Sequence, residues 1–186
     1  MLLPEPLLTP RLHIRPLTAD DLAAVFACYD NVEVRRYCAP VRWPDMDYAA
    51  AWFARMQARV ADGVAQQFVI ARRDNGAIIG TCVLFNIDNV NRRAEIGYAL
   101  GRDHWGGGYM QEAVARLIDH AFDTLKLHRI EAEIDPRNEA SARGLLRLGF
   151  SHDGTLKDRY LDDNEFADAG LYGLLESVWT TRTASH

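Results

Sequence analysis

The segment Arg93–Tyr109 reads RAEIGYALGRDHWGGGY, and it joins two patterns of different period. Residues 93–100 alternate along the chain, which is the period of a half-buried β-strand. One face of this strand carries Ala94, Ile96, Tyr98 and Leu100, and the other carries Glu95, Gly97 and Ala99. A glycine-rich turn follows, and residues 110–125 then have the apolar spacing of a helix packed on a sheet. A strand, a turn and a helix in this order predict a unit of an α/β fold.

The turn between this strand and this helix contains Gly106, Gly107 and Gly108. Glycine leaves the backbone bare, so an anion can approach the N–H groups at the helix start, where the helix dipole favours negative charge. A diphosphate is the anion that such a turn indicates. The turn is neither the dinucleotide fingerprint G-x-G-x-x-G nor a phosphate-binding loop, because no Gly-Lys-Ser/Thr follows. A turn that only reverses the chain is the alternative interpretation.

A second helix start follows the next expected strand. Residues 130–134 alternate as a strand, and Asn138 can cap a helix that runs to Leu148. Ligands bind α/β sheets where neighbouring strand ends diverge, so the two helix starts predict one shared binding site. Taken singly, Asn138 is an ordinary N-cap and Ser141 a solvated residue of the first helical turn.

The remaining pattern completes a mixed α/β sandwich in a single domain spanning residues 1–186. The further elements that we expect are a strand at 12–17, helices starting after Thr18 and after Pro44, a three-stranded meander over 68–100, and two strands over 150–174 around a turn at 162–164.

Composition excludes several classes of function. The chain has 21 Lys and Arg against 26 Asp and Glu, a net charge of −5, which argues against a nucleic-acid surface. No apolar run approaches the ~20 residues of a membrane span, and the first residues lack the pattern of a secretory signal. The three cysteines form no CxxC and the six histidines are scattered, which indicates free thiols in a reducing cytoplasm and no metal site.

Five segments of the chain, taken together, resemble the GNAT superfamily of acetyl-CoA-dependent N-acetyltransferases. They resemble most the RimJ/RimL-like branch, which acetylates the N-termini of ribosomal proteins. The matching segments run in the family's order and cover nearly the whole chain: 9–17 (TPRLHIRPL), 91–98 (NRRAEIGY), 105–109 (WGGGY) with Glu112-Ala113, 127–132 (LHRIEA), and 136–141 (PRNEAS) through 148–150 (LGF).

The resemblance implies a mixed, splayed sheet of about six to seven strands with helices on both faces. Acetyl-CoA would lie between the strand that ends at Leu100 and the strand that ends at Ile134. Its pantetheine arm would pair with the backbone of Tyr98, Ala99 and Leu100, and Asn138 would hold that arm. Its diphosphate would bind the turn formed by Trp105, Gly106, Gly107, Gly108 and Tyr109. A cytoplasmic homodimer is usual for the family.

The chemistry requires a neutral amine. An α-amino group, with a pKa of about 7.7–8.0, is far more often neutral at pH 7 than a lysine amine near 10.4, so a modest base serves a protein N-terminus. Our candidate base is Glu95, acting through an ordered water, and its alternative is a solvated strand carboxylate. A backbone N–H near Tyr98 or Ala99 would hold the oxyanion, and the Ser141 hydroxyl would donate to the departing thiolate.

The sequence departs from the family at two positions. Asp103 stands where the family usually has Gln or Arg before the glycine turn, and Leu145 stands where many relatives carry a tyrosine general acid. These departures leave open a non-catalytic acyl-CoA-binding module. Among enzymes, a small-molecule acceptor (amino acid, polyamine or aminoglycoside) is the alternative to a protein N-terminus. Tyr160 and Trp43 either line the acceptor cleft or pack in the interior.

Overall fold

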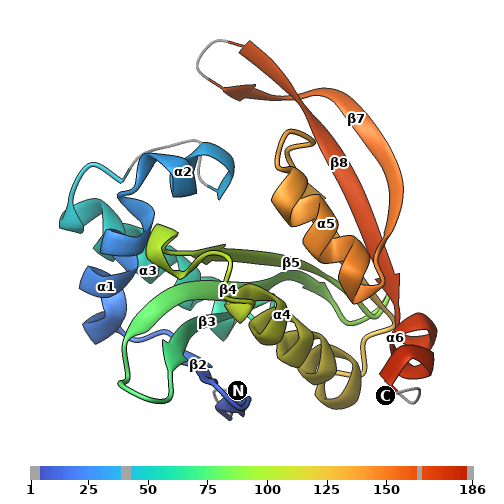
Figure 1. The fold of residues 1–186 in the computed structure, drawn as a ribbon, viewed down its shortest axis with the longest axis horizontal. Helices are drawn as coiled ribbons and strands as arrows, with labels where there is room; N and C mark the ends of the chain where they lie inside the picture. The colour runs from blue at the N-terminus through green and yellow to red at the C-terminus, as the bar shows by residue number, and fades with distance from the viewer. Residues whose placement is uncertain (1–4, 39–42, 163–164, 184–186) are drawn as a thin grey trace.

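The computed structural model describes residues 5–38, 43–162 and 165–183, and its central feature is an eight-stranded sheet in the order β1-β2-β3-β4-β5-β6-β8-β7 (Figure 1). Neighbouring strands are antiparallel except β5 and β6, which are parallel. The strands are β1 (Leu7–Leu8), β2 (Leu12–Pro16), β3 (Ala65–Arg72), β4 (Ile78–Asp88), β5 (Arg93–Leu100), β6 (Arg129–Ile134), β7 (Ser151–Asp162) and β8 (Glu165–Leu175).

Six α-helices occur in the described residues: α1 (Leu22–Tyr29), α2 (Val32–Cys38), α3 (Met46–Ala61), α4 (Tyr109–Asp119), α5 (Glu139–Leu148) and α6 (Glu176–Thr183). A π-helical turn, His120–Thr124, continues α4, and short 3₁₀ turns precede α1 and α4. None of these helices has both the length and the apolarity of a membrane span within the described ranges.

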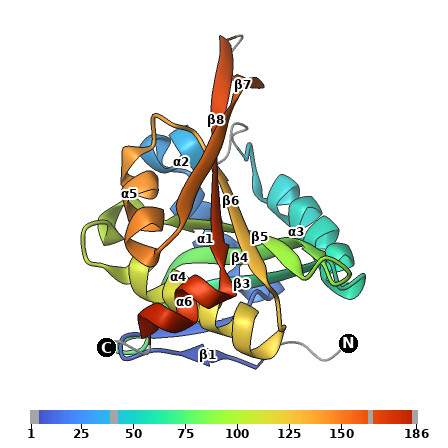
Figure 2. The ribbon, with the colours of Figure 1, turned by 90° about the vertical axis from the view of Figure 1, so that its right-hand side faces the viewer.

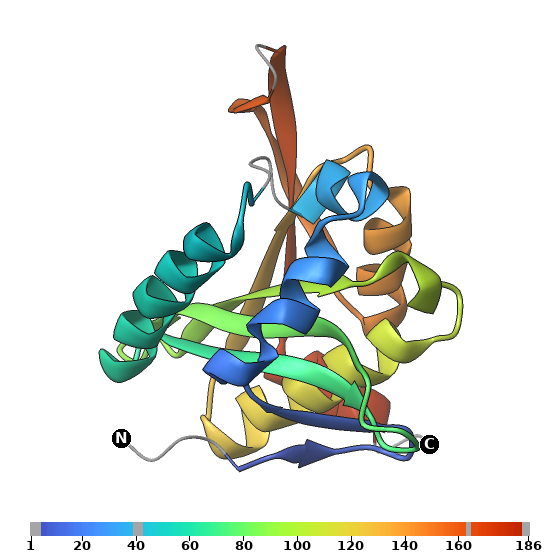
Figure 3. The ribbon, with the colours of Figure 1, turned by 90° about the vertical axis from the view of Figure 1, so that its left-hand side faces the viewer.

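The helices lie on both faces of the sheet, as predicted. Helices α1 and α3 pack on the face that includes Val69, whereas α4 and α5 pack on the face that includes Phe68 and Ile70. Figures 2 and 3 show α3 on one side of the sheet and α4, α5 and α6 on the other. Trp43 is only 8% exposed and stacks with aromatic side chains of α1 and α3, so it is a core residue of this layer.

The mixed α/β architecture predicted from the sequence is confirmed, but the strand number is eight and not six or seven. The additional strand is β1, which pairs with β2 over two residues and is too short to show an alternation in sequence. Helices α2 and α6, of seven and eight residues, were also not expected. Two residues of the predicted turn at 162–164 lie outside the described residues. Positions 39–42, before Trp43, lie outside them entirely.

The sheet splays between β5 and β6. These strands pair over three positions, Arg93↔Arg129, Ala94↔Ile130 and Glu95↔Glu131. Beyond Glu95, β5 stays paired with β4 as far as Leu100 and β6 stays paired with β8 as far as Ile134, but the two strands no longer pair with each other. Figure 1 shows the β7–β8 hairpin diverging from β5 on the far side of this gap.

Candidate active site

The glycine turn lies at the far end of β5 and begins α4. Gly106 and Gly108 have φ values of +77° and +75°, which L side chains rarely adopt. A Cβ atom at Gly106 would meet no atom within 4 Å, so backbone conformation and not crowding requires glycine there. The indole Nε1 of Trp105 donates to the Leu100 carbonyl oxygen at 2.9 Å and so ties the turn back to the strand end. The turn is exposed, and an anion can reach its N–H groups.

Asn138 caps α5, as its position in the sequence indicates. Its Oδ1 accepts a hydrogen bond from the Ser141 backbone N–H at 3.0 Å. Among the described residues, the Asn138 Nδ2 has no hydrogen-bond partner, so it is free to donate to a ligand. Helices α4 and α5 meet where Gln111 Nε2 donates to the Gly144 carbonyl at 3.5 Å, so both helix starts lie on the same face of the sheet.

The unpaired edge of β5 contains the three residues for which a backbone role was predicted. Tyr98, Ala99 and Leu100 pair with Cys82, Thr81 and Gly80 of β4 on one side. Because β6 has diverged, no strand covers their other side among the described residues. The backbone groups on this side of β5 therefore have no strand partner, which is the edge an extended chain with amide groups would pair with.

Two hydroxyl groups meet across the gap between β5 and α5. The Tyr98 hydroxyl and the Ser141 Oγ are 2.7 Å apart, and both residues are half-buried. From the sequence only a backbone role was expected for Tyr98, and the position of the family's tyrosine general acid was placed at Leu145, which is fully buried in the core. The alternation of residues 93–100 puts Tyr98 on the same face as Ile96 and Leu100. That alternation was the sequence signal that could have indicated which face of the strand the Tyr98 side chain occupies.

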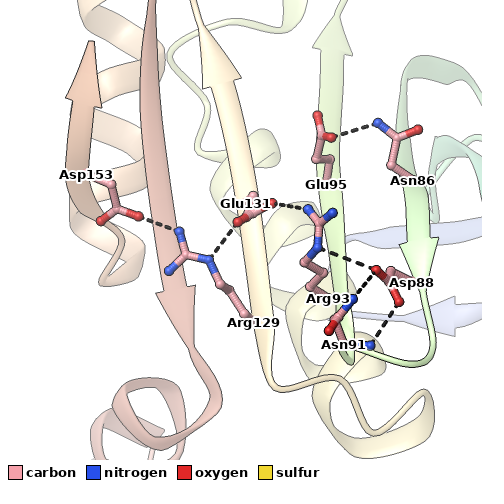
Figure 4. Close-up of polar contacts among 8 residues, drawn as sticks. All are labelled: Asn86, Asp88, Asn91, Arg93, Glu95, Arg129, Glu131 and Asp153. Atoms are coloured by element: carbon pink, nitrogen blue, oxygen red, sulfur yellow. Dashed lines mark hydrogen bonds and ion pairs between the residues drawn. The ribbon is translucent and has the colours of Figure 1, made fainter. Parts of the chain in front are cut away.

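Glu95 lies on the opposite face of β5, at the last position that pairs with β6 (Figure 4). Asn86 Nδ2 donates to Glu95 Oε1 at 2.7 Å, and Arg59 Nη2 donates to Asn86 Oδ1 at 2.9 Å. A guanidinium can only donate, so Arg59 fixes which end of the Asn86 amide faces Glu95. Asn86 adopts a φ of +49°, which asparagine tolerates better than most residues.

The neighbouring carboxylate on this face, Glu131, is neutralised. Its Oε2 accepts from Arg93 at 2.9 Å and its Oε1 accepts from Arg129 at 2.8 Å. Arg129 also donates to Asp153 on β7, and its hydrogen bonds to Asp153 and Glu131 raise the pKa of Arg129 (Figure 4). This ladder of alternating charge crosses β5, β6 and β7.

Glu133, one step further along β6, is also paired. It accepts from Arg159 at 3.3 Å and from the Tyr160 hydroxyl. Burial, together with Glu133, raises the pKa of Tyr160 to about 12. Of the three β5 and β6 glutamates on this face, Glu95 alone lacks a cationic partner among the described residues. A carboxylate held by one neutral amide keeps an oxygen available to accept a proton.

Asp103 lies in the exposed 3₁₀ turn between β5 and the glycines. The next residue back, Arg102, pairs with Glu33 of α2 and stacks on the Trp105 ring at 4.9 Å. The positive charge beside Asp103 is therefore already paired with a carboxylate of α2.

Comparison with known proteins gives the chemistry of this fold. Residues 11–151 match the family described as the acetyltransferase (GNAT) domain. The chain belongs to the GNAT acetyltransferase family. This acetyltransferase is 36% identical to an uncharacterized N-acetyltransferase p20 of Bacillus licheniformis, over 92% of the chain and 97% of that protein. The expected enzyme class, an acyltransferase, is confirmed.

Two further relatives carry more informative names. The acetyltransferase is 32% identical to the [ribosomal protein uS5]-alanine N-acetyltransferase of Escherichia coli, over 94% of the chain and 92% of that protein. Among solved structures, Mycobacterium smegmatis RimJ in complex with CoA-disulfide superposes with a TM-score of 0.81 at 26% identity, covering 94% of this chain and 88% of that one. The predicted likeness to the RimJ/RimL branch is confirmed.

Proposed function

We propose that this acetyltransferase transfers the acetyl group of acetyl-CoA to the α-amino group of a protein N-terminus, of the ribosomal-protein type. The observation that carries the proposal is the gap between β5 and β6, which has a glycine turn at one end and Glu95, a carboxylate without a cationic partner in the described residues, where it opens. The Escherichia coli relative that acts on ribosomal protein uS5 supports the choice of acceptor.

In this proposal acetyl-CoA binds along the unpaired edge of β5. The N–H groups of residues 106–109 bind its diphosphate, because the Trp105 N–H already donates to the Arg102 carbonyl oxygen. The backbone of Tyr98, Ala99 and Leu100 pairs with its pantetheine arm. Asn138 donates from its free Nδ2 to an amide carbonyl of that arm. The bound CoA-disulfide of Mycobacterium smegmatis RimJ supports the use of this cosubstrate.

Glu95 acts as the general base. A protein N-terminus with a pKa of about 7.7–8.0 needs to lose one proton before its lone pair attacks the thioester carbonyl. Glu95 accepts that proton through one ordered water, while Asn86 holds the carboxylate in place through Oε1. A backbone N–H near Tyr98 or Ala99 donates to the oxyanion of the tetrahedral intermediate, a contribution of about 3 kcal/mol.

Ser141 assists the departure of coenzyme A. When the carbon–sulfur bond breaks, the thiolate leaves with the electron pair and accepts a hydrogen bond from the Ser141 hydroxyl. The nitrogen loses its remaining extra proton as the amide forms, and that proton balances the thiolate as the free thiol. The Tyr98 hydroxyl, 2.7 Å from Ser141 Oγ, orients the serine donor. A thiolate with a pKa near 8.5 is a good leaving group, so a weak donor is sufficient.

The test is a thiol-release assay across acceptors. Peptides with free alanine and serine N-termini are compared with the same peptides blocked at the N-terminus, with free lysine and with spermidine. Turnover with the free peptides and none with the blocked ones supports the proposal. Turnover with spermidine or lysine alone would show that the acceptor is a small amine, and no thiol release with any amine would indicate a binding module.

The residue roles are tested by Glu95→Gln beside Glu131→Gln, a matched change on the adjacent strand. We expect Glu95→Gln to lower kcat by about a hundredfold or more with little change in the KM for acetyl-CoA. Glu131→Gln, whose carboxylate is already neutralised, keeps kcat within a few-fold. An unchanged pH–rate profile in Glu95→Gln would remove Glu95 from the mechanism. Ser141→Ala lowers kcat by about tenfold.

A further inference from the structure

The start of α4 carries a negative charge that the proposed function does not use. Glu112 lies in the first turn of this helix, three residues after Tyr109, and its side chain is 17% exposed. A carboxylate is stabilised there by the helix dipole. The same helix end, however, is where a diphosphate would bind, and two anions in one turn repel each other.

The segment between β1 and β2 holds this carboxylate. Thr9 Oγ1 and the Arg11 backbone N–H donate to Glu112 Oε1 at 2.5 and 2.9 Å, and Arg11 Nε donates to Oε2 at 2.6 Å. Burial alone would raise the pKa of Glu112, but these hydrogen bonds and the charge of Arg11 together lower it. Glu112 is therefore ionised at neutral pH, and Arg11 is its cationic partner.

Arg11 contacts the glycine turn as well as Glu112. Its Nη1 donates to the Gly107 carbonyl at 2.8 Å, and its guanidinium lies 4.5 Å from the centre of the Tyr109 ring. A Cβ atom at Gly108 would be 3.4 Å from its Nη2. The positive charge of Arg11 therefore lies between Glu112 and the glycine turn.

We propose that Arg11 is a positioning residue for coenzyme A, which acts by neutralising Glu112 so that this carboxylate does not repel the diphosphate. The inference rests on the proposed function, in which the diphosphate binds the glycine turn. Arg11 needs no contact with the ligand for this role, because its charge acts through Glu112. The ion pair has a second effect, which is to fasten the chain before β2 to the start of α4.

The proposal predicts that removing Arg11 and removing Glu112 have different effects on the affinity for coenzyme A. Arg11→Ala leaves Glu112 unpaired within one helical turn of the diphosphate, and we expect coenzyme A to bind about tenfold more weakly at low salt. Glu112→Gln leaves Arg11 as a free cation, so coenzyme A binds as tightly as in the wild type or more tightly. The double variant Arg11→Ala/Glu112→Gln recovers most of the lost affinity.

The experiment is calorimetric titration of coenzyme A into the wild type, both single variants and the double variant, in low and in high salt. Arg73→Ala is the matched control: Arg73 donates to the Thr9 carbonyl at 2.8 Å, and in the described contacts it touches neither Glu112 nor the turn. Thermal melts of each variant check folding.

Each result decides the matter. Equal affinity of Arg11→Ala and the wild type overturns the inference, and so does a double variant that stays as weak as Arg11→Ala, since Arg11 would then act by another route. If Glu112→Gln weakens binding as much as Arg11→Ala does, the pair has only a structural role. A wild type that binds no coenzyme A contradicts the proposed function itself, which separates the two failures.

Discussion

His120 makes the stability of this enzyme depend on pH in a direction that the structure determines. The residue lies in the π-helical turn after α4 and is 5% exposed. Its Nε2 lies 2.8 Å from Gln66 Oε1 on β3, and its ring meets the edge of Phe68. Burial, and to a lesser extent the charge of Arg116, lower the pKa of His120 below its ordinary value of 6.5.

The direction in which stability changes with pH follows from the number of protons that the folded and the unfolded chain bind. Below pH 6.5 the unfolded chain takes up a proton on this histidine that the folded chain does not, so stability falls as the pH falls. Lowering the pH from about 7.5 to about 5.5 costs at most RT ln 10, about 1.4 kcal/mol. For a chain of 186 residues, that loss lowers Tm by about 3–5 °C.

The assay is a pair of thermal melts at the two pH values for the wild type and for His120→Gln. Glutamine reaches the position of Nε2 with an N–H donor and does not titrate, so it keeps the hydrogen bond to Gln66 and removes the proton uptake. Asp119, whose pKa burial raises, acts with the opposite sign, but it is present in both proteins and its effect cancels. An equal loss of Tm in the two proteins would refute the reasoning.

Two further changes test the architecture of the site. Asn86→Gly keeps the positive φ and removes the donor to Glu95, so we expect kcat to fall by about tenfold with little change in the KM for acetyl-CoA; an unchanged kcat would exclude a positioning role for Asn86. Gly80→Ala places a Cβ atom against the carbonyl oxygen of Ala99, which cannot rotate away, so we expect a loss of about 3 kcal/mol in chemical denaturation and weaker binding of coenzyme A. Gly154→Ala on β7, with no atom within 4 Å of its Cβ, is the control and is expected to change stability by less than about 1 kcal/mol; equal losses in the two variants would contradict the crowding between β4 and β5.

The parts of the fold that the sequence predicts well are those with a local signal. The alternation over 93–100, the stripe over 110–125 and the Asn-Gly turn at 75–76 depend on neighbours a few residues away, and the structure has a strand, a helix and a turn there. Strand β1 was missed because two residues are too few for a period to show, and helices α2 and α6 were missed as well. The π-helical turn after α4 has no pattern that distinguishes it from an ordinary helical end.

The contacts of the candidate site were harder to predict from the sequence, because they join residues far apart in the chain. Glu95 was predicted as the base from its position on the strand. The residues next to it in the sequence do not indicate that Glu131 has two guanidinium partners while Glu95 has a neutral amide. The meeting of Tyr98 with Ser141 spans 43 residues, and that of Arg11 with Glu112 spans 101.

From the sequence by itself follow the order of strands and helices, the two polar helix starts after neighbouring strands, and hence the family and its chemistry. Only the tertiary structure decides where β5 leaves β6, which glutamate keeps no cationic partner in the described chain, and which residue neutralises the start of α4. The physical reason is that the two kinds of interaction act over different distances. Backbone periodicity and capping act over a few residues along the chain, whereas hydrogen bonds and ion pairs act over a few ångströms in space, and strand register determines which distant side chains come within that distance.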